Sequence, residues 1–218
     1  MGTIAGENDY SFVGSPIGNL DLWNSISDTQ VNPNGTQFIF SDSYANKIRK
    51  IDFSTGLFPY NKFYFHSMEI KIINKISLSI KNNKQFFYWE KNIKHKDSIS
   101  TIAGSGSNGN QNGNILIASF NNTNSIAIDW INSPEIIYVA DSGNYCIRRI
   151  SQTSSLVSTF AGNCSQAGYQ NGPLLSASFY NPNSIRYLSS SSGTKLLIAD
   201  KGNNVIRMID ISLGIFFA

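Results

Sequence analysis

The chain has 218 residues, of which 41% are hydrophobic and 14% charged, with a formal net charge of +3. This balance is typical of a globular protein and excludes a disordered or fibrous chain. No apolar run approaches the roughly 20 residues that a membrane helix needs, so we expect no membrane span. Met1 leads straight into a strand-like stretch without a secretion leader, and the compartment is left open.

A block of twelve residues occurs three times. It reads FSDSYANKIRKI at 40–51, VADSGNYCIRRI at 139–150 and IADKGNNVIRMI at 198–209. In each copy an aspartate precedes an arginine by seven residues. The pairs are Asp42 and Arg49, Asp141 and Arg148, and Asp200 and Arg207. Two landmarks precede each block in the same order: T-[IF]-A-G from Thr3, Thr101 and Thr159, and NSI from Asn24, Asn124 and Asn183.

Each copy predicts about four short strands and no amphipathic helix. Apolar runs such as 136–140 end at polar turns, and the returning stretch 146–150 alternates with period two. A period of roughly 40–60 residues with four strands indicates propeller blades. The repeated A-D-x-x-N-x-x-I-R and T-[IF]-A-G motifs resemble the NHL-repeat family over 1–56 and 101–211. We therefore expect an all-β fold, an open NHL-type β-propeller of about three four-stranded antiparallel blades.

The domain boundaries follow from the copies. We predict a first blade with a preceding outer strand at 1–56, an insert at 57–98, a second blade at 99–158, an incomplete third blade at 159–211 and a truncated tail at 212–218. A three-blade arc leaves the apolar faces of its end blades uncovered. We therefore expect a fragment of a larger NHL-repeat protein that self-associates through exposed blade edges.

The aspartate of each block heads a tight turn. We expect its carboxylate to accept backbone N–H groups about two residues further on, and Gly143 or Gly202 to supply a positive φ. Copy one has no glycine in this turn, so its geometry should differ. At least one arginine of the returning strand should lie buried between blades with an aspartate or a carbonyl as partner. The pairs either hold the blades in register or form a repeated ligand ring.

The insert at 57–98 differs in composition from its surroundings. It has no glycine, alanine or arginine, and it carries eight of the 17 basic residues but only three of the 14 acidic ones. A solvated excursion between the third and fourth strands of the first blade is the usual interpretation. A basic and aromatic binding patch is an alternative. A third hypothesis is that 57–98 and 215–218 are translated intron, because both begin just after the third strand and its glycine.

The two cysteines do not recur between copies. Cys146 falls on a strand and Cys164 in a loop, so we expect free thiols rather than a disulfide framework. Glycosylation sequons occur at Asn34, Asn121 and Asn163, and a chain so rich in asparagine and serine is expected to contain some by accident.

Catalytic chemistry has little support in the blades. Both histidines, His66 and His95, fall in the insert, so a zinc site of the kind found in lyases that resemble NHL repeats lacks its imidazole ligands. Calcium ligands could come from Asn124, Asn183 or Asp129, but the asparagines recur between copies, which favours a structural role. We expect no cofactor, no metal and no enzyme activity. The alternative is a propeller hydrolase or lyase whose metal site is completed by further blades.

The remaining function is binding. The loops from AG to NSI, at 6–23, 104–123 and 162–182, should emerge on the same face as the aspartate turns. Phe120 and Phe179 hold equivalent places and should be core anchors. The family resemblance implies a non-catalytic interaction scaffold that binds a protein partner through these loops. Nucleic acid is disfavoured because the blades are slightly acidic overall. The candidate partner-binding residues are Tyr10, Phe12, Trp23, Tyr169 and Tyr180.

Overall fold

The computed structural model describes the backbone of residues 2–3, 12–13, 22–23, 26–52, 62–65, 68–73, 75–79, 88–89, 98–190 and 193–217, and the side chains of 26–52, 100–189 and 193–214. All regular elements in these ranges are strands or single turns of 3₁₀ helix. No helix in them is long and apolar enough to cross a membrane.

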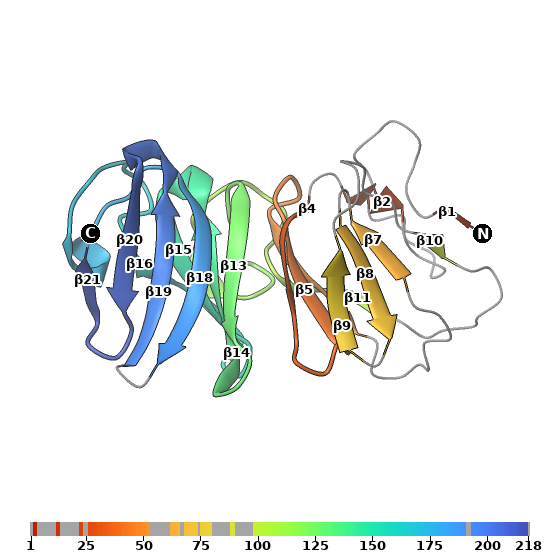
Figure 1. The fold of residues 1–218 in the computed structure, drawn as a ribbon. Helices are drawn as coiled ribbons and strands as arrows, with labels where there is room; N and C mark the ends of the chain where they lie inside the picture. The colour runs from red at the N-terminus through yellow and green to blue at the C-terminus, as the bar shows by residue number, and fades with distance from the viewer. Residues whose placement is uncertain are drawn as a thin grey trace.

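Three antiparallel sheets form the blades, and they lie side by side in Figure 1. Blade one consists of β4 (Ile26–Val31), β5 (Gln37–Asp42), β6 (Lys47–Asp52) and β11 (Ser98–Ala103). Blade two consists of β13 (Thr123–Asp129), β14 (Ser133–Asp141), β15 (Cys146–Ser151) and β16 (Leu156–Ala161). Blade three consists of β18 (Pro182–Ser190), β19 (Gly193–Asp200), β20 (Val205–Asp210) and β21 (Ile215–Phe217). The chain is thus an all-β partial propeller with four-stranded antiparallel blades, as its repeats predict.

Short elements complete these sheets. A two-residue strand borders blade two at β12 (Gly113–Asn114) and blade three at β17 (Gly172–Pro173). The 3₁₀ turns are η1 (Ser142–Asn144), η2 (Leu174–Ser176) and η3 (Lys201–Asn203). We call the end of the blades that carries η1 and η3, the upper end in Figure 1, the Asp-turn end.

The fourth strand of a sheet comes from the start of the next sequence copy. β11, which ends in the TIA of the second TIAG, pairs with β6 of blade one, and β16, which ends in the TFA of TFAG, pairs with β15. The sheets therefore straddle the copies counted along the sequence. Blade three also has a fourth strand, because β21 pairs with β20. The expectation that this copy lacks one is wrong.

The insert lies between β6 and β11, the third and fourth strands of blade one, as predicted. Within it, β7 (Lys62–Phe65), β8 (Met68–Ile73) and β9 (Lys75–Ser79) form an antiparallel sheet. β10 (Tyr88–Trp89) pairs with β1 (Gly2–Thr3), and β2 (Phe12–Val13) pairs with β3 (Leu22–Trp23). His66 and His95 lie outside the described residues. The translated-intron hypothesis concerns the transcript and stays a prediction.

Alternation along the strands divides the core into two layers. In β14, Ile137 and Val139 face blade one, whereas Tyr138 and Ala140 face blade three. Both faces of blade two are therefore buried, which is the arrangement of stacked propeller blades. Loop residues Phe120 and Phe179 are fully buried, one in each layer, and this confirms their prediction as core anchors.

The strand register corrects one landmark. Thr123 lies opposite Asp141 and Pro182 opposite Asp200, but in blade one it is Ile26 that lies opposite Asp42. In blade one, Ser27 therefore holds the position of Asn124 and Asn183. Asn24 lies three residues before that position, so its NSI is not equivalent to the other two. A three-letter match was too short to fix the register of an inner strand.

Candidate functional site

The repeated aspartates bind the loop that precedes their own blade. Asp141 accepts the backbone N–H of Asn121 at 2.8 Å through Oδ1, and Nδ2 of Asn144 at 2.9 Å and Nη1 of Arg148 at 3.0 Å through Oδ2. Asp200 accepts the equivalent three donors, from Tyr180, Asn203 and Arg207, at 2.8, 2.7 and 3.0 Å. The expectation that the carboxylate caps its own turn is wrong for these two blades, because the caught N–H lies 20 residues earlier in the chain.

Blade one keeps the ion pair and adds a contact within the turn. Asp42 accepts Nε of Arg49 at 2.8 Å and the backbone N–H of Ala45 at 3.3 Å, which is the local turn contact predicted for all three. Ala45 occupies the place of Asn144 and Asn203, so the amide that reaches the loop in the other blades is replaced by a methyl group.

Gly143 and Gly202 do not have the positive φ that we expected. Glycine is needed there because the turn packs closely against the preceding loop. The residues with positive φ are Asn46, Tyr145 and Asn204, at the fourth turn position of all three blades, so blade one shares this feature. A Cβ built on Gly143 would lie 2.7 Å from the carbonyl oxygen of Asn121. Gly143 donates its N–H to that oxygen at 2.9 Å, and a side chain would separate the turn from the loop.

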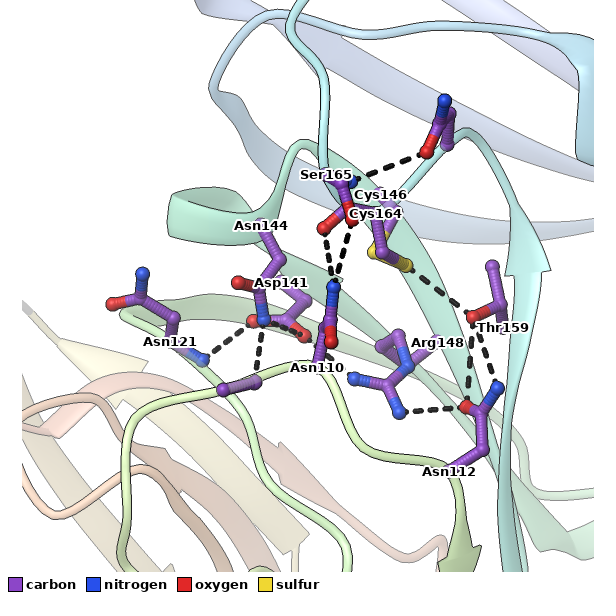
Figure 2. The surroundings of a disulfide bond; sticks show 12 residues. Asn110, Asn112, Asn121, Asp141, Asn144, Cys146, Arg148, Thr159, Cys164 and Ser165 are labelled. Carbon is purple, nitrogen blue, oxygen red and sulfur yellow. Dashed lines mark hydrogen bonds and ion pairs between the residues drawn. A yellow bond between two sulfur atoms is a disulfide. The ribbon is translucent and has the colours of Figure 1, made fainter.

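The two arginines hold the loops by donating hydrogen bonds to main-chain oxygens of the loops. Arg148 donates to the carbonyl oxygens of Ser119 and Gln111, both at 3.0 Å, and to Oδ1 of Asn112 at 2.8 Å. Figure 2 shows its guanidinium between Asp141 and Asn112. Arg207 makes the equivalent contacts with the oxygens of Ser178, Gln170 and Asn171, at 2.6, 2.8 and 2.6 Å.

Each guanidinium also lies over an aromatic core anchor. The Cζ of Arg148 is 5.3 Å from the ring centroid of Phe120, and that of Arg207 is 5.1 Å from the ring of Phe179. These distances are within cation–π range. We call each set of aspartate, asparagine and arginine in blades two and three a clamp; the sets are Asp141, Asn144 and Arg148, and Asp200, Asn203 and Arg207.

Burial perturbs the ionisation of the clamps. Removal from water raises the pKa of the Asp141 carboxyl, while hydrogen bonds from Asn121 and Asn144 and the charge of Arg148 act in the opposite direction. Burial also lowers the pKa of Arg148, against the attraction of Asp141. Both side chains are fully inaccessible to solvent, so each charge depends on the other for compensation.

The cysteines form a disulfide, so the expectation of free thiols is wrong. Cys146, the first residue of β15, is bonded to Cys164 in the loop that leaves β16 (Figure 2). The antiparallel register places Ile147 opposite Ala161, which brings both cysteines to the Asp-turn end. The pairing of the two cysteines follows from this strand register. Asn110 joins the two loops here, since its Nδ2 donates to the carbonyl oxygen of Cys164 at 2.8 Å and to Oγ of Ser165 at 3.1 Å.

The clamped loops form an uncharged surface. Neither 104–122 nor 162–181, which together we call the loop layer, contains an acidic or basic residue, and both are rich in asparagine, glutamine and serine. Tyr169 and Tyr180 are 57% and 48% exposed in this layer, and their role as partner-binding residues stays a prediction. The ring of Tyr180 lies 6.0 Å from that of Tyr145, and the ring of Tyr169 lies 4.9 Å from the Arg207 guanidinium.

The first loop is largely outside the described residues. Tyr10 is not described, and of Phe12 and Trp23 only the backbone is, where the two lie opposite each other in β2 and β3. Their prediction as contact residues is untested.

The residues considered for calcium do not converge. Nδ2 of Asn124 donates to Oδ1 of Asn183 at 3.2 Å, whereas Asp129 accepts the Tyr187 hydroxyl at 2.5 Å near the other end of the strand. Within the ranges whose side chains are described, no three His, Cys, Asp or Glu residues gather as a metal site would require.

The inner strands are linked by a polar bridge across three blades. Oδ2 of Asp28 in β4 accepts Oγ of Ser125 in β13 at 2.5 Å and Nη1 of Arg186 in β18 at 3.0 Å. Ser125 also accepts the backbone N–H of Ile185 at 3.1 Å. The bridge thus links strands of all three blades through hydrogen bonds to Asp28 and Ser125.

No family model and no curated protein matches the sequence, but solved structures share the fold. A Bacteroides thetaiotaomicron protein superimposes with a TM-score of 0.51 at 16% identity, over 86% of this chain and 34% of its own. A structural genomics protein of unknown function from the same species gives 0.49 at 18%, over 84% and 46%. A catalytically inactive virginiamycin B lyase from Staphylococcus aureus gives 0.32 at 14%, over 94% and 75%. The chain spans less than half the length of the two Bacteroides proteins.

Proposed function

We propose that this chain is a non-catalytic binding module that recognises a protein partner through the loop layer of blades two and three. The observation that carries the proposal is the pair of clamps, which hold two long uncharged loops by their main-chain oxygens and leave tyrosine and amide side chains outward. Loops held in place before binding lose little conformational entropy when a partner arrives.

The composition of the layer supports a protein partner. Tyrosine, serine, glycine and asparagine dominate paratopes, because tyrosine supplies contact area at low entropic cost and the small polar residues adapt their hydrogen bonds. The absence of lysine and arginine from 104–122 and 162–181 leaves nothing to neutralise phosphates there. Nucleic acid is therefore disfavoured as the ligand of this layer.

The proposal is tested by quantitative affinity capture with matched surface variants. Tyr169→Ser with Tyr180→Ser alters the loop layer, and Ile131→Ser with Leu213→Ser alters exposed residues at the opposite end of the blades. We expect partner enrichment to be lost with the tyrosine variant, since an aromatic hot spot contributes about 2 kcal/mol or more. Enrichment should persist with the control variant, and circular dichroism should show both to be folded. A partner that tolerates the tyrosine variant but not the control would place binding at the other end.

Self-association through blade edges stays part of the proposal. Ile206 of blade three is 73% exposed, whereas Ile147, at the same position of blade two, is fully buried under its neighbour. The outward face of blade three thus repeats a pattern that elsewhere packs against another blade.

A further inference from the structure

The three sequons have different structural settings, and within the described residues the sequon hydroxyl donates to the acceptor side chain in only one of them. Asn34 lies at the tip of the β4–β5 hairpin and is exposed, at the end of blade one opposite the Asp turns. Asn163 is exposed in the loop layer, and Asn121 is half-buried beneath the turn of blade two.

At Asn34 the hydroxyl of the sequon is directed at the acceptor side chain. Oγ1 of Thr36 donates to Oδ1 of Asn34 at 2.7 Å, and the backbone N–H of Thr36 donates to the same oxygen at 3.2 Å. Nδ2 of Asn32 donates to Oγ1 of Thr36 at 3.1 Å, so the single hydroxyl proton is left for Asn34. A backbone N–H can only donate, so the atom that accepts it is the amide oxygen, and within the described residues no hydrogen bond occupies Nδ2 of Asn34.

This turn is local and needs no other part of the propeller. An asparagine that accepts the N–H two residues on forms an Asx turn, which short peptides adopt by themselves. Gly35 has a φ of 73°, which glycine adopts without steric cost, and its N–H donates to the carbonyl oxygen of Asn32 at 2.9 Å. The acceptor geometry is therefore accessible to a nascent chain and stays exposed after folding.

The other two sequons are engaged in the fold. At Asn121 the hydroxyl-bearing Thr123 is fully buried, and the Asn121 side chain packs against the backbone of Gly143. At Asn163, Oδ1 accepts the backbone N–H of Ser165, but within the described residues the Ser165 hydroxyl donates no hydrogen bond to it. Oγ of Ser165 accepts Nδ2 of Asn110. The middle residue there is Cys164, held in the disulfide.

The disulfide gives an independent indication of the compartment. Disulfides form and persist in secretory and extracellular environments, which are also where asparagine is glycosylated. We propose that Asn34 is an N-glycan acceptor and that Asn121 and Asn163 are not. In the transfer, Nδ2 of Asn34 attacks the anomeric carbon of a lipid-pyrophosphate-linked oligosaccharide. The new C–N bond forms as the C–O bond to the pyrophosphate breaks, the amide proton passes to a base of the transferase, and the lipid pyrophosphate leaves.

The test uses the full chain secreted from a eukaryotic host behind a cleavable leader. Peptide N-glycosidase F in ¹⁸O-water converts a glycosylated asparagine to labelled aspartate, which mass spectrometry assigns to a position. We expect the label at position 34, a mobility shift on removal of the glycan, and an intact disulfide between Cys146 and Cys164. An unlabelled Asn34 in this secreted, oxidised protein overturns the proposal.

Matched variants separate the acceptor from its neighbours. Asn34→Gln and Thr36→Val should abolish the shift, Thr36→Ser should retain it because the hydroxyl is kept, and Asn163→Gln should leave it unchanged. Asn32→Ala should lower occupancy, since the hydroxyl proton is then free to turn elsewhere. A shift that survives Asn34→Gln and disappears with Asn163→Gln would assign the glycan to the loop layer instead and contradict the inference.

Discussion

Blades two and three contain the same clamp in different surroundings. Their arginines, asparagines and aspartates contact loop atoms at identical sequence separations, down to the 29 residues between each arginine and the carbonyl oxygen it binds. The surroundings differ in two respects. Blade two is covered on both faces and carries the disulfide, whereas in blade three Val205 replaces Cys146 and Ile206 is exposed. The hydrogen bonds and the burial of the clamp are therefore fixed by a blade and its own loop, while burial of the opposite face, which carries Ile147 or Ile206, depends on the next blade.

The largest expected effect tests whether the same clamp contributes equally to the stability of both blades. Arg148→Met leaves Asp141 as a buried carboxylate without its countercharge, and we expect a loss of about 3–5 kcal/mol in the free energy of unfolding. Arg207→Met leaves Asp200 in the same situation, and because both clamps are fully buried we expect a loss of similar size. Urea denaturation of both variants measures the difference.

Arg149→Met is the control for this comparison. Arg149 neighbours Arg148 on the opposite face of β15 and is only half-buried, so a loss of about 1 kcal/mol is expected. A much smaller loss for Arg207→Met than for Arg148→Met would contradict this expectation and show that a blade on the opposite face adds to the clamp.

The disulfide is the next largest difference between the blades. It closes a loop between residues 18 apart, and its reduction should lower the free energy of unfolding by about 3 kcal/mol. Reductant should destabilise the wild type and leave Cys146→Ala with Cys164→Ala unchanged, as measured by thermal unfolding with and without dithiothreitol. A double variant that still responded to reductant, or a wild type that did not, would contradict this role.

The smallest effect concerns the outward faces. Ile147→Val removes a methylene from a buried layer and should cost about 1 kcal/mol, whereas Ile206→Val should be nearly neutral. Ile206→Glu should also reduce self-association in light-scattering chromatography, because it places a charge on the uncovered face. Equal costs for the two valine variants, or an unchanged oligomer with glutamate, would mean that the face of blade three is not a packing surface.

The spacing of aspartate and arginine made the pairing predictable from sequence, because seven residues carry a chain around one tight turn to the facing strand. Strand number and the buried positions of Phe120 and Phe179 followed from the same repeats. The atoms that the clamps hold were not predictable, since they are carbonyl oxygens, which every residue type carries. The residue types of Ser119 and Gln111 do not indicate that their carbonyl oxygens accept hydrogen bonds from Arg148.

Two wrong predictions, the free thiols and the NSI match at Asn24, have the same cause, because both depend on how neighbouring strands are aligned. The Cys146–Cys164 bond depends on how β15 pairs with β16, and the false match at Asn24 depends on how β4 pairs with β5. Composition and recurrence carry no information on either. In blade one the positions of the two cysteines are held by Lys47 and Gly106, and a Cβ built on Gly106 would lie 3.2 Å from Cε of Lys47. The positions thus meet in both blades, although only one pair can be cross-linked.

Because the arginines bind main-chain oxygens, the backbone path of a loop depends little on which side chains the loop carries. Asn110 and Asn121 of blade two become Tyr169 and Tyr180 in blade three, yet the oxygens that Arg148 and Arg207 hold keep their places. Side chains in these loops can thus be exchanged during evolution without redesign of the framework that carries them. Under the proposed binding function, point mutations at the loop surface would be enough to change the partner, because the clamp keeps the loop backbone in place.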